Sequence, residues 1–231
     1  MSIDHSSTDT STNENSLLAP ASEALSAVFR ETARVVTLEA RQVLFNQGDV
    51  GESLYIVLSG RLEISVVSED GRRLTLNTVG AGQIVGEIAI FDGGPRTATI
   101  EATEQSELME ITRHEIRRKI RKNTEIAFEL LELAGRRLRW LEGLLEDRSF
   151  KSLEVRLAKR VLYLLWSNDG VATDRVSLSQ AELADHVGAT RVAVASVLQH
   201  WRQEGFLKSF RGQIEILERQ KLEEKAEQEV F

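Results

Sequence analysis

The chain has 231 residues, of which 42% are hydrophobic, and it carries a formal net charge of −7 at pH 7. This hydrophobic content is typical of globular proteins with packed cores and excludes general disorder. The absence of cysteine excludes disulfides, thiol catalysis and cysteine-ligated zinc or iron–sulfur clusters. No apolar run approaches the ~20 residues of a membrane span, and the first residues lack signal-peptide features, so we expect a cytoplasmic protein without a membrane partner.

The N-terminal half of the sequence is predicted to form a tail and a β-domain. Residues 1–20 are rich in serine, threonine and asparagine, which predicts a disordered tail. Within 21–111, runs such as "SLYIVLSG", "RLEISVVS" and "RLTLNTVG" alternate between apolar and polar residues, and glycines or an "EDG" turn separate them. This period-two alternation with frequent turns predicts an antiparallel β-barrel or β-roll.

One stretch of the β-region, "GEIAIFDGGPRTAT" (86–99), places an acidic and a basic residue on either side of an apolar turn. The apolar residues predict one turn of helix packed on the core, so that Glu87 and Arg96 flank one cavity. A carboxylate accepts hydrogen bonds and a guanidinium binds anions. Each residue alone would be read as an ordinary surface charge, but the pair in this spacing favours a polar ligand site.

A long helical segment is predicted over 112–148, where the glycine punctuation stops. Apolar residues recur there at steps of four and three, the spacing of a coiled-coil seam. A second apolar stripe, which includes Ile126, Leu130 and Leu133, is suited to packing on the β-roll. We therefore expect a homodimer, the alternative being that the helix packs only on its own chain. The predicted dimer seam consists of Leu131, Ala134, Leu138, Leu141 and Leu145.

A winged helix-turn-helix is predicted over 149–219, after a hinge at "DRSFKSL" (147–153). Ser179 and Thr190 are placed to cap two helices, and Gly188 provides the turn between them. Gly205 and Gly212 delimit a β-hairpin wing. The remaining 220–231 form an acidic tail, and the sequence leaves open whether it is a dangling or a packed helix.

The predicted second helix of this unit is suited to the DNA major groove. Between His186 and Arg211 four basic residues stand against one acid, and Arg191 lies at the helix start, where a base reader belongs. The alternative is an ordinary helical hairpin with a solvated arginine. The candidate DNA-binding residues are Ser179, Gln180, Thr190, Arg191, Val192, Ser196, His200, Arg202, Lys208 and Arg211.

The order of β-roll, long helix and winged helix-turn-helix, together with "GEIAI" followed by "PRTAT", resembles the cyclic-AMP receptor protein and FNR group of bacterial transcription regulators over about 21–220. The resemblance implies an α+β fold with an N-terminal cyclic-nucleotide-binding β-roll, a long dimerisation helix and a C-terminal winged helix-turn-helix. It also implies that Glu87 binds the ribose 2′-hydroxyl and Arg96 the cyclic phosphate. The implied ligand-binding residues are Gly86, Glu87, Ile88, Ala89, Arg96 and Thr97.

Two departures from the family pattern affect specificity. Leu141 and Glu142 fall where the best-known cyclic-AMP receptor has a threonine–serine pair that touches adenine, so we include both as candidate ligand residues and leave the base preference open. Val192 and Ser196 replace the family's base-reading glutamate and second arginine. We therefore expect a different operator, in which valine could touch a thymine methyl group.

We interpret the chain as a ligand-responsive DNA-binding regulator and not an enzyme, with no metal site and no cofactor. The expected effector is a cyclic purine nucleotide, with cyclic AMP narrowly ahead of cyclic GMP. The expected partners are a double-stranded DNA operator and a second copy of the chain, with RNA polymerase as a further candidate. Two alternatives stay open: a regulator that binds DNA without a cyclic mononucleotide or responds to another nucleotide, and a sensor module that acts on a protein partner.

Overall fold

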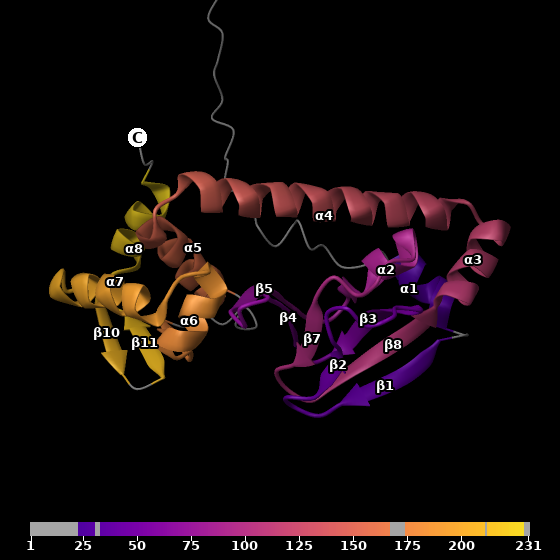
Figure 1. The fold of residues 1–231 in the computed structure, drawn as a ribbon, viewed down its shortest axis with the longest axis horizontal. Helices are drawn as coiled ribbons and strands as arrows, with labels where there is room; N and C mark the ends of the chain where they lie inside the picture. The colour runs from indigo at the N-terminus through magenta and orange to yellow at the C-terminus, as the bar shows by residue number, and fades with distance from the viewer. Residues whose placement is uncertain (1–22, 31–32, 167–173, 211, 229–231) are drawn as a thin grey trace, which may run out of the picture.

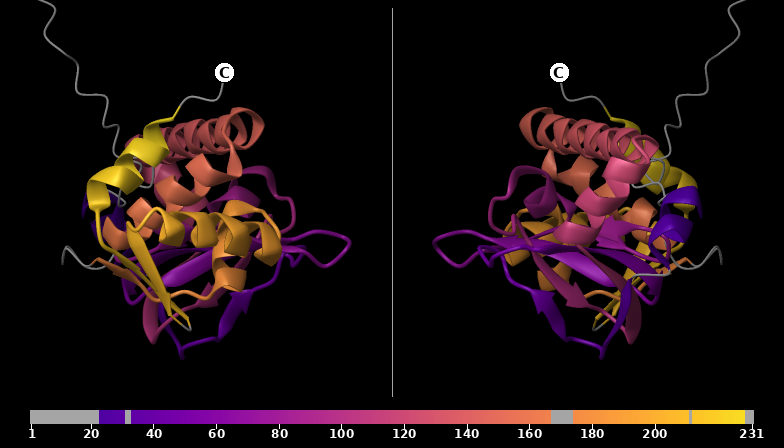
Figure 2. Two further views of the ribbon diagram at one scale, coloured as in Figure 1. Left: turned by 90° about the vertical axis from the view of Figure 1, so that its left-hand side faces the viewer. Right: turned by 90° about the vertical axis from the view of Figure 1, so that its right-hand side faces the viewer.

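A computed structural model describes residues 23–30, 33–166, 174–210 and 212–228 (Figure 1). The predicted tail at 1–20 lies outside these residues. Two lobes are joined by one long helix, which runs along one side of both, as the two side views also show (Figure 2). None of the helices in the described ranges is both long and apolar enough to cross a lipid bilayer.

The N-terminal lobe is the predicted β-roll, made of two four-stranded antiparallel sheets. The first sheet has the order β1 (Arg34–Leu38), β8 (Ser106–Thr112), β3 (Ser53–Ser59), β6 (Ile84–Val85). The second has the order β2 (Val43–Phe45), β7 (Thr99–Ala102), β4 (Leu62–Val67), β5 (Arg73–Val79). Inward-facing residues of both sheets, such as Val57, Leu62 and Leu108, form the core between them. The alternation along each strand therefore separates a buried face from an outer one.

Helices cover the outer face of the first sheet. They are α1 (Glu23–Arg30), α2 (Glu87–Asp92), α3 (Arg113–Lys122) and the long helix α4 (Glu125–Phe150). Ile126, Leu130 and Leu133 of α4 are buried in a cluster with Leu54 and Ile56 of β3. One of the two apolar stripes predicted on the long helix thus packs on the β-roll.

The helical segment predicted as continuous over 112–148 is divided into α3 and α4, which corrects the sequence prediction. Thr112 caps α3 in a capping box with Glu115. Asn123 ends α3 in an extended conformation, and its side-chain Oδ1 accepts a hydrogen bond from the backbone N–H of Glu125, 3.1 Å away. Asparagine competes with the helix for backbone donors in this way, so a new helix begins after it.

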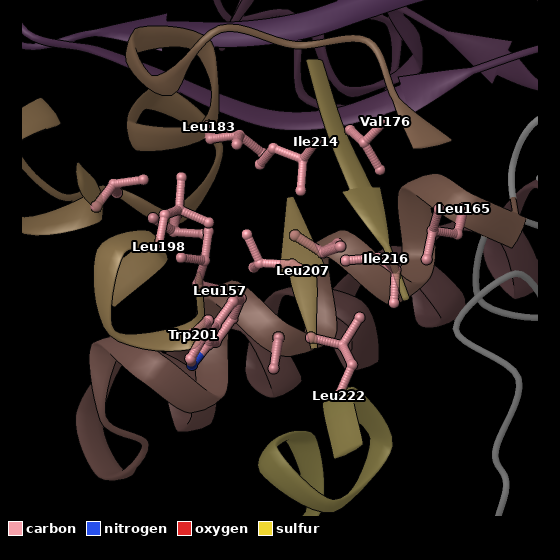
Figure 3. Close-up of a cluster of buried hydrophobic side chains, with 14 of the residues drawn as sticks. Leu157, Leu165, Val176, Leu183, Leu198, Trp201, Leu207, Ile214, Ile216 and Leu222 are labelled. Carbon is pink, nitrogen blue, oxygen red and sulfur yellow. The ribbon is translucent and has the colours of Figure 1, made fainter. Parts of the chain in front are cut away.

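The C-terminal lobe is a winged helix-turn-helix. It contains α5 (Leu153–Trp166), β9 (Arg175–Val176), α6 (Gln180–Val187), α7 (Arg191–Gln203), β10 (Leu207–Phe210) and β11 (Gln213–Ile216). The predicted hairpin is part of a three-stranded sheet, β10–β11–β9, because the two-residue strand β9 adds to it. Its own core gathers around Leu157, Leu198 and Trp201 (Figure 3).

The residues predicted as an acidic tail, 220–231, belong to the lobe as far as the structure describes them. Helix α8 (Arg219–Glu227) packs on α5, and its Leu222 is completely buried. Lys225 Nζ lies 3.0 Å from Glu154 of α5 and 3.3 Å from Glu204. Burying a leucine contributes about 1.5–3 kcal/mol, so this helix is docked and is not a dangling tail.

Candidate functional site

The stretch singled out in the sequence forms a sharp turn from β6 into α2. Gly86 adopts a left-handed conformation with φ of 78°, which other residues rarely adopt. A Cβ atom there would lie 2.7 Å from Nη1 of Arg96. Gly86 is therefore required both for the turn and for the close approach of the arginine.

Arg96 is buried in this turn, with 5% of its surface exposed. Its Nη1 donates a hydrogen bond of 2.8 Å to the carbonyl oxygen of Gly86, and its guanidinium lies 4.0 Å from the ring centroid of Phe45. Its Nε is buried and has no hydrogen-bond partner. Burial lowers the pKa of Arg96, although Tyr55 and Glu87 oppose this change. The buried Nε of Arg96 is therefore a donor that a ligand in this turn could satisfy.

Glu87 is also buried, but its ion-pair partner is not Arg96. Its Oε1 accepts a hydrogen bond of 3.0 Å from Nε of Arg137, and Nη2 of Arg137 donates to the carbonyl oxygen of Ile84 at 2.5 Å. Sequence reasoning missed Arg137. The available signal was its position on α4, which continues the buried stripe of Leu130 and Leu133 at helical spacing, where a charged residue needs a partner.

A cavity of about 290 Å³, here called the β-roll cavity, lies between this turn, the second sheet and α4. Its lining combines the Glu87–Arg137 ion pair and Arg96, which is unpaired among the described residues, with apolar side chains. The residues are Phe45, Ile64, Leu76, Val85, Gly86, Glu87, Ile88, Ala89, Arg96, Thr97, Ala98, Ile100, Arg137, Trp140 and Leu141. An apolar wall with a few convergent polar groups is typical of a small-molecule site.

The structure brings seven of the eight predicted ligand residues to this cavity. Glu142 is the exception: it is exposed and does not line the β-roll cavity within the described chain. Each residue turns a helix by about 100°, so a helix that directs Leu141 toward the cavity carries Glu142 away from it.

The helix-turn-helix has the predicted caps. The Ser179 side chain accepts from the backbone N–H of Glu182 in a capping box, and Thr190 accepts from the backbone N–H of Ala193. Gly188 provides the left-handed turn with φ of 62°. The turn residues read from the sequence therefore have the expected roles.

Helix α7 has one face buried in the core of the C-terminal lobe and one face exposed. Val194, Leu198 and Trp201 are buried, and Trp201 Nε1 donates to Glu154 at 2.8 Å. On the outer side Arg191 is exposed, and Val192 has 78% of its surface exposed. This is the geometry of a helix whose N-terminal residues are free to enter a groove of DNA.

A second group of predicted DNA residues lines a cleft of about 400 Å³ between the wing and the first residues of α6 and α7. Ser179, Gln180 and Arg191 meet Phe210 and Gln213 of the hairpin there. Of the other candidates, Ser196, Arg202 and Lys208 are exposed outside the cleft, and His200 Nε2 lies 3.0 Å from Glu204. Arg211 lies outside the described residues.

The predicted dimer seam forms an apolar strip along α4, separate from the buried residues Ile126, Leu130 and Leu133. Leu131, Leu138 and Leu145 have 66%, 59% and 67% of their surface exposed, and Leu141 has 43%. Ala134 is half-buried. Four exposed leucines on one helix are uncommon in an isolated chain.

Comparisons with known proteins agree with this architecture. A family model described as the cyclic nucleotide-binding domain matches residues 35–123, and one described as the Crp-like helix-turn-helix domain matches residues 155–225. A CRP-like cAMP-activated global transcriptional regulator from Mycobacterium tuberculosis is 34% identical over 170 residues, covering 71% of this chain and 75% of the relative. A cyclic AMP receptor protein from Thermus thermophilus is 33% identical over 181 residues, covering 78% and 82%.

Solved structures share the fold. A transcriptional regulator of the CRP/FNR family from Thermus thermophilus has a TM-score of 0.73 at 26% identity, covering 85% of this chain and 100% of that chain. A regulator of this family from Eubacterium rectale, at 24% identity, has a TM-score of 0.77. With both domains matched in order and two relatives above 30% identity, the chain belongs to the CRP/FNR family of DNA-binding transcription regulators, which are not enzymes.

Proposed function

We propose that this regulator is switched by a cyclic purine nucleotide in the β-roll cavity, with cyclic AMP narrowly preferred to cyclic GMP. The observation that carries the proposal is the buried guanidinium of Arg96, whose Nε has no hydrogen-bond partner and which makes no ion pair within the described chain. A buried charge without a counter-charge is costly. A cyclic phosphate would supply both the charge and the missing acceptor.

Glu87 is the proposed partner of the ribose. Arg137 fixes one carboxylate oxygen, Oε1, and the proposed role of the other oxygen is to accept from a hydroxyl on the ligand. The lining residues Ile64, Val85 and Leu141 offer apolar contacts to the base. Glu87 and Arg96 serve both nucleotides equally, and Thr97 can serve either base, so the preference for cyclic AMP rests on the resemblance and on the names of the relatives.

Helix α4 is the proposed link from ligand to DNA. Arg137 and Leu141 reach the β-roll cavity, while Leu138 and Leu145 lie on the exposed strip where a second copy would pack. A ligand that contacts α4 differently in two arrangements of the dimer shifts the equilibrium between them. The paired helix-turn-helix units would then fit two half-sites of one operator in the cytoplasm, with RNA polymerase as a candidate further partner.

Two alternative functions are considered beside the proposed one. A global regulator of the same fold from Xanthomonas campestris, 22% identical, is described as responsive to cyclic di-GMP, so another nucleotide or no nucleotide is the second candidate. A sensor that acts only on a protein partner is the third. The C-terminal helix-turn-helix, with its exposed Arg191 and Val192, argues against it.

A gel shift on genomic DNA fragments, with and without each nucleotide, distinguishes the three candidate functions. Specific binding that requires cyclic AMP or cyclic GMP supports the proposal. Specific binding of equal strength without nucleotide supports the second candidate, and the absence of specific binding under all conditions supports the third.

A further inference from the structure

Three helices of the C-terminal lobe meet at one carboxylate, that of Glu154 in the first turn of α5. Its Oε1 accepts a hydrogen bond of 2.8 Å from Nε1 of Trp201 on α7, and the same oxygen lies 3.0 Å from Nζ of Lys225 on α8. Burial acts to raise the pKa of Glu154, but the hydrogen bonds from Trp201 and Lys225 lower it overall. One acceptor thus joins α7 and α8 to the start of α5.

Lys225 contacts α7 at a second point, the end of that helix. Its Nζ lies 3.3 Å from the carboxylate of Glu204, the C-cap residue of α7. The side chains of Lys225, Glu154 and Glu204 have only 18%, 29% and 35% of their surface exposed. Isolated surface ion pairs contribute little to stability, but a network of several partly buried charges holds its members in one geometry. Lys225 therefore fixes Glu204 of α7 relative to Glu154 of α5.

The apolar side of α8 determines the point from which Lys225 contacts these carboxylates. Leu222 is completely buried, and Ala226 packs against the same core, to which Trp201 also belongs (Figure 3). Leu222 and Lys225 are three positions apart, so they lie on one side of the helix. Docking of Leu222 therefore directs Lys225 toward α5 and α7.

The angle of α7 decides where its N-terminal residues lie. Arg191 and Trp201 are ten positions apart on α7, which corresponds to about 15 Å along the helix axis. A tilt of about 5° at Trp201 would therefore move Arg191 by about 1.3 Å. Hydrogen bonds to base edges need donor–acceptor distances of about 2.7–3.2 Å, so this displacement is enough to lose one. Charge interactions with phosphates act over longer distances and tolerate it better.

We propose that Lys225 is a positioning residue for the recognition of the DNA operator. Through Glu154 and Glu204 it sets the angle at which α7 presents Arg191 to the base pairs. The proposal rests on the role of α7 as the helix that reads DNA, and it does not require Lys225 to touch DNA. Helix α8 thereby acts on sequence specificity, in addition to adding its own buried surface to the lobe.

The test compares Lys225→Met with Lys221→Met in the full-length protein, by fluorescence anisotropy on random DNA and on an operator that the wild type selects from random duplexes. Lys221 is the matched control, because it pairs with Glu218 at the N-cap of the same helix and its side chain is 44% exposed. Lys225→Met should bind the operator at least tenfold more weakly and lose much less affinity for random DNA. Lys221→Met should bind both like the wild type, and Lys225→Arg, which keeps the charge, should restore operator binding.

The indole N–H of Trp201 provides a readout that needs no DNA. Its resonance in a ¹H–¹⁵N NMR spectrum should shift in Lys225→Met and stay in place in Lys221→Met, because only the first change alters the surroundings of Glu154. Glu154→Gln keeps the test valid if Lys225→Met does not fold. This variant retains an acceptor for Trp201 and removes the charge that holds Lys225, so it should also weaken operator binding more than random binding.

Several results would overturn the proposal. Equal losses on the two DNAs, or a fall of about one in the slope of log K against log salt concentration, would make Lys225 a phosphate contact. A lower Tm of Lys225→Met with unchanged operator binding would mean that α8 only stabilises the lobe, and unchanged operator binding by Glu154→Gln would remove the link through Glu154. A wild type that prefers no operator would refute the reading role of α7 on which the proposal rests.

Discussion

Arg137 joins α4 to the turn between β6 and α2 through a buried ion pair with Glu87. The side chains of Arg137 and Glu87 have 11% and 5% of their surface exposed, and Nε and Oε1 are 3.0 Å apart. Removing one member of a buried pair leaves the other charge without compensation. The pair therefore stabilises the contact between α4 and the cavity only while both members are present.

We predict that Arg137→Met lowers the free energy of unfolding by about 3 kcal/mol, because it strands the Glu87 carboxylate. Adding Glu87→Gln to this variant should recover about 1–3 kcal/mol, since the stranded charge is removed. Urea unfolding of the wild type, both single variants and the double variant measures this coupling. Strictly additive effects would show that the ion pair contributes nothing specific.

At the DNA interface, Arg191→Ala should weaken binding to the specific operator by about 1–3 kcal/mol, because one bidentate contact to guanine is lost. Binding to random DNA should be weakened less. The melting temperature of the protein should not change, since the Arg191 side chain is exposed. Fluorescence anisotropy on both DNAs provides the comparison. Equal losses on the two DNAs would mean that Arg191 contacts only phosphate.

Residue identity predicted much of the lining of the candidate site. The stretch 86–96 can be recognised from sequence alone, because it combines a turn residue, a hydrogen-bond acceptor and an anion binder. These are Gly86, Glu87 and Arg96. The partner of Glu87 was not predictable in this way, since it comes from α4, 50 positions further along the chain. Only the packed structure shows which of several arginines on α4 contacts Glu87.

At the scale of elements, the exposed strip on α4 gives a prediction about assembly. Leu138→Lys combined with Leu145→Lys should separate the proposed dimer into monomers, because like charges would face each other across the seam. DNA affinity should fall with it, since each half-site would be bound independently. Analytical ultracentrifugation gives the assembly state. A double variant that still sediments as a dimer and binds its operator would place the interface elsewhere.

The elements were predicted best where local chemistry decides them. Ser179, Gly188 and Thr190 delimit α6 and α7 through caps and a positive φ, and the structure has the same boundaries. The break at Asn123 was missed because the apolar periodicity on either side hides a single capping residue. Strand β9 was missed for a different reason: two residues are too few for any alternation, and its pairing with β11 is long-range.

At the scale of the whole molecule, the two lobes are held together by polar contacts as well as by α4. Tyr163 of α5 donates a hydrogen bond of 3.1 Å to Asn77 of β5, and α6 packs beside β5 (Figure 1). His186 lies in this region, and its Nδ1 is 2.6 Å from Nη2 of Arg160. No sequence pattern predicts such contacts, since they depend on the angle at the hinge between α4 and α5.

His186 should make the stability of the protein sensitive to acid. Burial, then Arg160 and Arg73, lower its pKa from 6.5 to about 3, so the folded form does not take up a proton that the unfolded form accepts below pH 6.5. This contribution to stability is fully present above pH 6.5 and is lost as the pH falls toward 3, by up to about 1.4 kcal/mol per pH unit.

We therefore predict that the wild type loses stability more steeply than His186→Gln between pH 6.5 and 4.5. Urea unfolding at several pH values in that window measures the two slopes. Parallel slopes would show that protonation of His186 does not cause the loss of stability.

The central claim is that Arg96 binds the phosphate of a cyclic nucleotide, and titration calorimetry of cyclic AMP and cyclic GMP into the wild type and Arg96→Ala tests it most directly. The wild type should bind at least one of them, and Arg96→Ala should lose about 1.5–3 kcal/mol, which is roughly ten- to a hundredfold in Kd. Arg72→Ala is the control, because the Arg72 side chain is 83% exposed in the same lobe and should bind like the wild type. Wild-type protein that binds neither nucleotide, or an Arg96→Ala variant that binds as tightly as the wild type, would contradict the account.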